Sequence, residues 1–289
     1  MSENPDHDMP DVTCQDVVTH FLHRDVKAIA YYEPVVHEGL DAEGVHQLRV
    51  SARRLRSELR AMNRVLPPQP WTDLEGDLKW LGSTLGELRD LEVLRGLFEA
   101  HLDPDTELRS AVMVALDGRR EKRQRDVVVA LNSARYARMI KRLGRLAKHP
   151  HLGEISDTPA AELFMAPLWD AACGYFGAIG DPYERRSDEA LHRVRIASKK
   201  CRYNFEVASL FLGEPASVVA ASLEEIQDVL GQVHDRVVAV MFLDTLKFAE
   251  EVDLEVRRAM RAEIGVLRPQ WIVHFEAARR GILEVFSVK

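Results

Sequence analysis

Two segments of the chain place a histidine and several basic residues at the same intervals. His46 is followed by Arg49, Arg53 and Arg56, and the pattern His-x-x-Arg-x-x-x-Arg/Lys-x-x-Arg returns 146 residues later. On a helix these positions form a row about 15 Å long beside an apolar stripe. Like charges one turn apart repel each other, and a guanidinium fork can bind two phosphate oxygens. The pattern therefore predicts a site for a phosphate-bearing anion, whose second-copy residues are His192, Arg195, Lys199 and Arg202.

The repeat extends beyond the basic residues. The segment 45–50 is matched by 191–196, and the segment 85–90 is echoed by 230–235 at an offset of 145 residues. Such self-similarity indicates that one structural unit was duplicated. We therefore expect a single domain over residues 1–289, made of a first half (12–147), a connection (148–159) and a second half (160–285).

Hydrophobic periodicity predicts helices almost throughout the chain. Apolar residues recur at intervals of three and four, strand-like alternation is scarce, and proline or glycine marks the breaks. The sequence thus predicts an all-α fold with about eight helices, four in each half. Each set of four could close into an antiparallel four-helix bundle.

Charge is strongly segregated along the chain. The formal net charge is −7, yet residues 45–60 carry +4, residues 191–202 carry +5 and residues 119–148 carry +9. This balance excludes a generally cationic coat for nucleic acids or membranes and favours a local site for a polyanion. Three separated cysteines, and the lack of any apolar run of about 18 residues, predict a soluble protein of the reducing cytoplasm.

Two carboxylates recur at the same place in the repeat. Asp90 and Asp235 each follow a helix glycine, Gly86 and Gly231. We expect these aspartates either to orient the basic side chains or to form ordinary interhelical ion pairs. The histidines also have two interpretations, because an imidazole can donate to phosphate directly or can orient a neighbouring arginine.

The chain resembles the CHAD family, the conserved histidine α-helical domain. The resemblance is carried by the repeated histidine and arginine motif, by the two Leu-Gly-x-x-Arg/His-Asp segments, and by Arg202-Tyr203 followed by Glu206. It implies two antiparallel four-helix bundles related by a pseudo-twofold axis, whose basic residues face a central pore or groove that binds inorganic polyphosphate. A non-catalytic cytoplasmic binder is implied, with polyphosphate granules as a further location.

The resemblance also implies which side chains face the polymer. Members of the family often accompany a triphosphate-tunnel β-barrel with an ExExK motif, and this sequence contains neither, so a stand-alone member is expected. Asp90 and Asp235 would support the site. A long basic fourth helix in the first half would add Arg120, Arg123, Arg135 and Lys141, by charge and helical phase. The two motif copies would contribute His46, Arg49, Arg53, Arg54, Arg56, His192, Arg195, Lys199, Lys200 and Arg202.

Other classes of function remain alternatives. We expect no enzyme activity and no cofactor, because the sequence lacks a Walker-type loop, a nucleophile elbow and a His-Glu-x-x-His motif. A divalent-metal-binding helical module would use the histidines and aspartates, but the neighbouring arginines disfavour a metal ion. A nucleic-acid-binding protein would need exposed aromatic rings beside the cations, and the candidates there are Tyr136, Tyr203 and Phe205.

Overall fold

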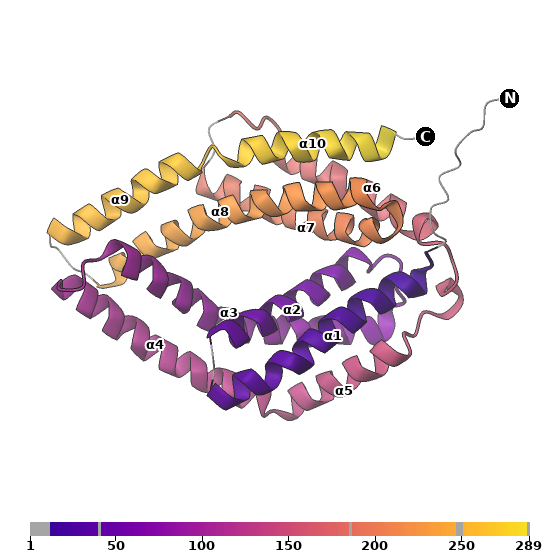
Figure 1. The fold of residues 1–289 in the computed structure, drawn as a ribbon, viewed down its shortest axis with the longest axis horizontal. Helices are drawn as coiled ribbons and strands as arrows, with labels where there is room; N and C mark the ends of the chain where they lie inside the picture. Colours follow the sequence, from indigo (N-terminus) through magenta and orange to yellow (C-terminus); the bar gives the residue numbers. More distant parts are fainter. Residues whose placement is uncertain (1–11, 40–41, 185–186, 247–250, 288–289) are drawn as a thin grey trace.

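The chain folds into helices, as expected. The structure is a computed structural model that describes residues 12–39, 42–184, 187–246 and 251–287, and within these ranges it contains ten α-helices, one short 3-10 turn and no strand. The all-α prediction is confirmed. The helices, labelled in Figure 1, are α1 (Cys14–Gly39), α2 (Ala42–Ala61), α3 (Pro68–His101), α4 (Glu107–Leu131), α5 (Ala134–Lys148), α6 (Ala160–Ile179), α7 (Asp188–Leu212), α8 (Glu214–Leu246), α9 (Glu251–Leu267) and α10 (Trp271–Ser287).

Five helices, rather than four, precede the 3-10 turn at Gly153–Ile155, and five follow it. The expected long fourth helix is two helices, because α4 ends at Leu131 and α5 begins at Ala134. The break has neither proline nor glycine. Instead, the Ser133 side chain accepts a hydrogen bond from the backbone N–H of Tyr136 and so caps a new helix. Sequence reasoning missed this cap.

Two glycines end helices in the second half. Gly180 follows α6 with φ of 58°, and Gly213 follows α7 with φ of 68°. A side chain would be strained in this left-handed conformation, whereas glycine adopts it readily. Gly180 therefore ends α6, and Gly213 ends α7 before α8 begins, so that α7 is a separate helix between α6 and α8.

The helices pack around two groups of buried side chains. A large core is formed mainly by α1, α2, α5, α6, α7, α10 and the first parts of α3 and α8. A smaller core joins the far ends of α3 and α8 to α4 and α9, with Phe98 against Phe242. In Figure 1 these ends extend to the left of the molecule. The long helices α3 and α8 thus run through both cores.

Helices in equivalent positions of the two halves contact each other. α2 packs against α7, α3 packs against α8, and α1 touches α6. Because α2 and α7 carry the two copies of the basic motif, this contact brings the two copies together. A twofold axis between the halves would also place each helix against its equivalent in the other half.

An ionic cluster is buried between α1 and α2. The Arg24 guanidinium donates to Asp25 at 2.7 Å and to Glu58 at 2.5 Å, and both carboxylates are buried. Burial, together with the charge of Asp25, raises the pKa of Glu58 to about 8 despite the nearby arginine. Burial disfavours the charged form of a carboxyl group, so Glu58 holds a proton at pH values where exposed glutamates have lost theirs.

This raised pKa predicts a pH-dependent stability. Because folded Glu58 binds its proton more tightly than unfolded Glu58, the free energy of unfolding should fall as the pH rises from about 4.5 towards 8. Glu58→Gln should remove at least about 1 kcal/mol of this fall. Urea unfolding at pH 5 and pH 8 measures it, with the exposed Glu121→Gln as the control. Parallel profiles for Glu58→Gln and the natural protein would contradict the assignment.

Gly281 of α10 packs closely against α8. A β-carbon there would lie 2.7 Å from Val219 Cγ2, whereas one at Gly265 of α9 would meet nothing within 4 Å. Gly281→Ala should therefore lower the free energy of unfolding by about 1–3 kcal/mol, because the core must shift to fit it. Gly265→Ala should be neutral or slightly stabilising. Denaturant unfolding distinguishes the two variants, and equal stabilities would refute the close packing.

Candidate anion-binding site

Both copies of the motif lie on helices whose apolar side is anchored in the large core. On α2, Val45, Leu48 and Leu55 are fully buried, and the arginines of the adjoining side are half-buried. On α7, the apolar side chains of Leu191, Val194 and Cys201 are buried likewise. The core therefore fixes the rotation of each helix about its axis, and this rotation directs the basic side chains.

Four cations converge where α2 meets α7. We call them the basic row: Arg49 and Arg53 of α2, and Arg195 and Lys199 of α7. Burial, and then the charges of Arg53 and Arg195, lower the pKa of Lys199 to about 7, with Arg49 adding to the effect. Burial also lowers the pKa of Arg49 and of Arg195, and Arg53 acts on both. Such repulsion requires proximity, so cations of both halves share one site.

The basic row has few acidic partners. Arg49 lies 3.7 Å from Asp90, measured from Nη2 to Oδ1, and within the described part of the chain Arg53, Arg195 and Lys199 form no ion pair. The Nε atoms of Arg49, Arg53 and Arg195 are buried there without a hydrogen-bond acceptor. A buried N–H group without an acceptor is costly, and a charged one more so. An anion entering the row would supply the missing acceptors.

The repeated glycines have a packing role. A β-carbon at Gly86 would lie 3.4 Å from Arg49 Nε, and one at Gly231 would lie 3.7 Å from Arg195 Nη2. Both distances are ordinary van der Waals contacts, so in each half an arginine of the basic helix packs against the glycine on α3 or α8. The glycine was visible in the repeat, but sequence reasoning gave it no function. The sequence signal for this packing was that a glycine recurs at the same position of a predicted helix in both copies.

The end of the motif nearest the helix C-terminus is paired within the fold. Arg202 is buried, forms an ion pair with Glu224, and lies 3.5 Å from Glu206 and 4.7 Å from the Tyr203 ring centre. Its equivalent, Arg56, lies 3.6 Å from Glu75. Carboxylates therefore neutralise Arg56 and Arg202, which were predicted as ligands. Both arginines lie at the edge of the site, outside the basic row.

Two other predicted residues lie beside the row. Lys200 is exposed on α7, one step round from Lys199. Arg54 is half-buried, and its charge acts on Glu206, whose pKa is nevertheless raised because burial dominates. Neither residue is among the cations that act on Lys199. The structure thus separates both from the basic row.

The histidines and aspartates gather at the other end of the row. Burial and the charge of Arg89 lower the pKa of His46, and burial and the charge of Arg195 lower the pKa of His234. His192 is exposed, with its ring centre 5.7 Å from that of His234. Burial raises the pKa of Asp235 even though Arg195 opposes this shift. The aspartates thus lie near the motif arginines, as the repeat suggested.

The expected contribution of a fourth helix is divided between two places. Arg120 and Arg123 lie on α4, and Arg123 pairs with Glu87 at 2.9 Å. Arg135 lies on α5, where it pairs with Asp77 at 2.9 Å and covers the Trp80 ring. Lys141 is exposed on α5. The prediction of one continuous helix was wrong, and Arg123 and Arg135 are engaged by acids of α3.

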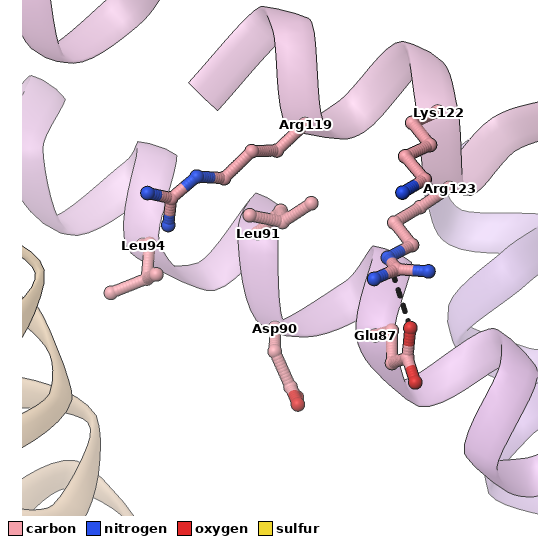
Figure 2. Close-up of a pocket in the computed structure, with 7 residues that line it drawn as sticks. All are labelled: Glu87, Asp90, Leu91, Leu94, Arg119, Lys122 and Arg123. Atoms are coloured by element: carbon pink, nitrogen blue, oxygen red, sulfur yellow. Dashed lines mark ion pairs between the residues drawn. The ribbon is translucent and has the colours of Figure 1, made fainter. Parts of the chain in front are cut away.

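A pocket of about 500 Å³ adjoins the row between α3 and α4. Its basic side chains are Arg119, Lys122 and Arg123 of α4. In Figure 2, Arg119 projects above Leu91 and Leu94 of α3, whereas Lys122 and Arg123 lie on the side of Glu87. Asp90, which lies beside Arg49, also lines this pocket. The other lining residue is Glu87, the partner of Arg123.

The equivalent pocket of the second half has lost its basic side. A shift of 144 residues carries Arg119, Lys122 and Arg123 of α4 onto Glu263, Val266 and Leu267 of α9, which line a pocket of about 320 Å³ together with Arg236 of α8. Glu263 there pairs with Arg236 and with His101. The duplicated halves therefore match in the basic row but differ outside it.

Comparison with known proteins agrees with this architecture. The family model for the CHAD domain matches residues 20–244, which is more than half of the chain. The chain belongs to the CHAD domain family. The matched part of this CHAD domain begins in α1 and ends in α8, so it contains both motif helices and both glycines that adjoin them.

Solved structures and curated relatives extend the comparison. The CHAD domain from the plant Ricinus communis is 27% identical, with a TM-score of 0.66 over 94% of this chain and 92% of that one. PptA from Streptomyces chartreusis shares the fold, at 17% identity and a TM-score of 0.63 over 96% and 100%. Two curated relatives are 30% identical to this chain over 68% of its length. They are the uncharacterized proteins MT2285 and Rv2226 of Mycobacterium tuberculosis, from strains CDC 1551 / Oshkosh and ATCC 25618 / H37Rv. The match covers 39% of the length of these relatives.

The charged neighbours of His46 and His234 can be tested by titration. Replacing Arg195 with alanine removes a positive charge beside His234, so the pKa of His234 should rise towards its usual value. Arg49→Ala should raise the pKa of His46 in the same way. NMR titration of the imidazole protons measures both shifts, and each variant is the control for the other. If neither pKa moves in its own variant, the row is not arranged as described.

Proposed function

We propose that this CHAD domain binds inorganic polyphosphate, without catalysis, through the basic row. The observation that carries the proposal is that Arg53, Arg195 and Lys199 face one another across the contact between α2 and α7 without an ion-pair partner in the described residues. A phosphate group offers acceptor oxygens and negative charge together. Each charge-assisted hydrogen bond to it is worth about 1.5–3 kcal/mol.

A polymer fits this arrangement better than a single phosphate. Successive phosphates of one chain can contact cations of both halves, and each bound group raises the effective concentration of the next. Arg56 and Arg202, although paired with acids, flank the row and would exchange carboxylate partners for phosphate. A central pore or groove along the α2–α7 contact remains part of the proposal.

The aromatic residues near the row distinguish inorganic polyphosphate from nucleic acids. Single-stranded nucleic acids are held by stacking of bases on exposed rings. Tyr136, Tyr203 and Phe205 are only 2%, 3% and 0% exposed, and Tyr203 lies beneath the Arg202 guanidinium. These three rings therefore offer no stacking platform, which favours a ligand made of phosphates alone.

No group of side chains in the described residues supports the alternative of divalent-metal binding. In the described ranges, no three histidine, cysteine or acidic side chains are grouped so that they could hold a metal ion. The cations around His46 and His234 also repel a divalent ion. Within the same ranges no helix has the length and apolar character to cross a bilayer. A location in the cytoplasm or on polyphosphate granules is part of the proposal.

Charge reversal in both halves tests the proposal. Arg53→Glu combined with Arg195→Glu should weaken binding of long-chain polyphosphate by about 100-fold or more, because two charge-assisted contacts become repulsions. It should also flatten the fall of affinity with added salt, since fewer counterions are released. Titration calorimetry at 50 and 200 mM salt measures both effects.

The matched control is Arg125→Glu with Arg138→Glu, exposed arginines of α4 and α5, which changes the net charge equally. This control should bind with nearly the natural affinity, and circular dichroism should show intact helices in both variants. Equal weakening by both pairs would mean that overall charge, not the basic row, holds the ligand. Displacement of polyphosphate by single-stranded DNA of equal phosphate content would favour the nucleic-acid alternative.

A further inference from the structure

Lys199 occupies an unusual position in the basic row. It is the repeat equivalent of Arg53, 146 residues later, so the second half carries a lysine where the first carries an arginine. An arginine keeps its charge at every pH a protein meets, whereas a lysine ammonium loses its proton when burial and like charges make the charged form unfavourable. Lys199 is therefore the member of the row whose charge can change.

The groups that face Lys199 are cationic. Lys199 is half-buried on α7, the helix that packs against α2, and the Nε atoms of Arg53 and Arg195 on these two helices are buried without a hydrogen-bond acceptor. The charges of Arg49 and Arg53 from α2, and of Arg195 and Arg202 from its own helix, act on Lys199. None of the largest electrostatic effects on Lys199 comes from α6 or α8, which also pack against α7. Among the acids of α8, Glu224 pairs with Arg202, and Asp235 and Asp228 act on Arg195.

We propose that binding of polyphosphate to the basic row is coupled to the uptake of a proton by Lys199, so that affinity rises as the solution becomes less alkaline. This inference rests on the proposed function. In the free protein, the unpaired arginines on both sides disfavour an ammonium at Lys199. A phosphate between these cations replaces repulsion by attraction, and the ammonium then becomes the favoured form.

The direction and range of the effect follow from the titration of Lys199. In the free protein its pKa is about 7, so at pH 8 most molecules carry neutral Lys199. If bound phosphate restores the pKa of an ordinary lysine, binding takes up roughly 0.9 proton at pH 8 and roughly 0.5 at pH 7. Affinity should then be roughly 50-fold higher at pH 7 than at pH 9, and the contribution of Lys199 should level off below pH 7.

Titration calorimetry with long-chain polyphosphate, in buffers of different ionisation enthalpy at pH 7, 8 and 9, measures the protons taken up. The deciding variant is Lys199→Arg, which keeps the positive charge but cannot release it. Its proton uptake at pH 8 should be lower than that of the natural protein by most of one proton, and its affinity should change far less between pH 7 and pH 9. The control is Lys148→Arg, at an exposed lysine at the end of α5, which should behave as the natural protein does.

The outcomes separate the two claims. If the natural protein and Lys199→Arg bind with the same proton uptake and the same pH dependence, the coupling is refuted while polyphosphate binding stands. If the natural protein binds polyphosphate at none of these pH values, the proposed function itself fails. A second measurement addresses Lys199 directly: NMR of ¹³C-methylated lysines should show its pKa rising in Arg53→Ala, and rising in the natural protein when pyrophosphate is added. A pKa that stays near 10 throughout overturns the coupling.

Discussion

Repulsion among cations that the fold holds close together is the constraint on which this site depends. The charge of Arg53 lowers the pKa of Arg49, Arg195 and Lys199, and the charge of Arg195 lowers that of Arg49 and Lys199. Among the described residues, Asp90 is the only acid that forms an ion pair with a member of the basic row. Such a group of charges stays together only because other contacts hold it. On a protein whose net charge is −7, such a local group of cations favours an anionic ligand at this place, and this supports the proposed binding of polyphosphate.

The hydrophobic cores supply those contacts. Each basic helix buries an apolar stripe, and an arginine of each packs against a glycine, Gly86 on α3 or Gly231 on α8. The halves meet through equivalent helices, so the motif of one half faces the motif of the other. Outside the row this likeness fades: the pocket between α3 and α4 keeps basic residues, whereas its counterpart between α8 and α9 has glutamate, valine and leucine. The pocket next to the row therefore offers basic side chains in the first half, whereas α9 contributes none to the pocket of the second half.

The sequence was sufficient for the all-α class and for the two separate rows of basic residues on α2 and α7, because both follow from intervals of three and four residues along single helices. Arg49 and Arg195 could be placed beside an apolar stripe without coordinates. Pairing between distant helices could not be read in this way: Arg135 looked like a ligand until Asp77 of α3 was found 2.9 Å away. The break before Ser133 was also missed, since a serine cap is a weaker signal than proline or glycine. The spacing of charged residues along one helix can be read from the sequence. Whether an acid of another helix neutralises them depends on how the helices pack.

The central claim is that cations from both halves contact one polymer. The most direct measurement is a crystal structure of the protein with a polyphosphate of defined length. We predict phosphate oxygens within hydrogen-bond distance of Arg53 from α2 and of Arg195 and Lys199 from α7, on a single continuous chain. Polyphosphate bound elsewhere, for example along the exposed basic side of α5 with the row left empty, would contradict the account.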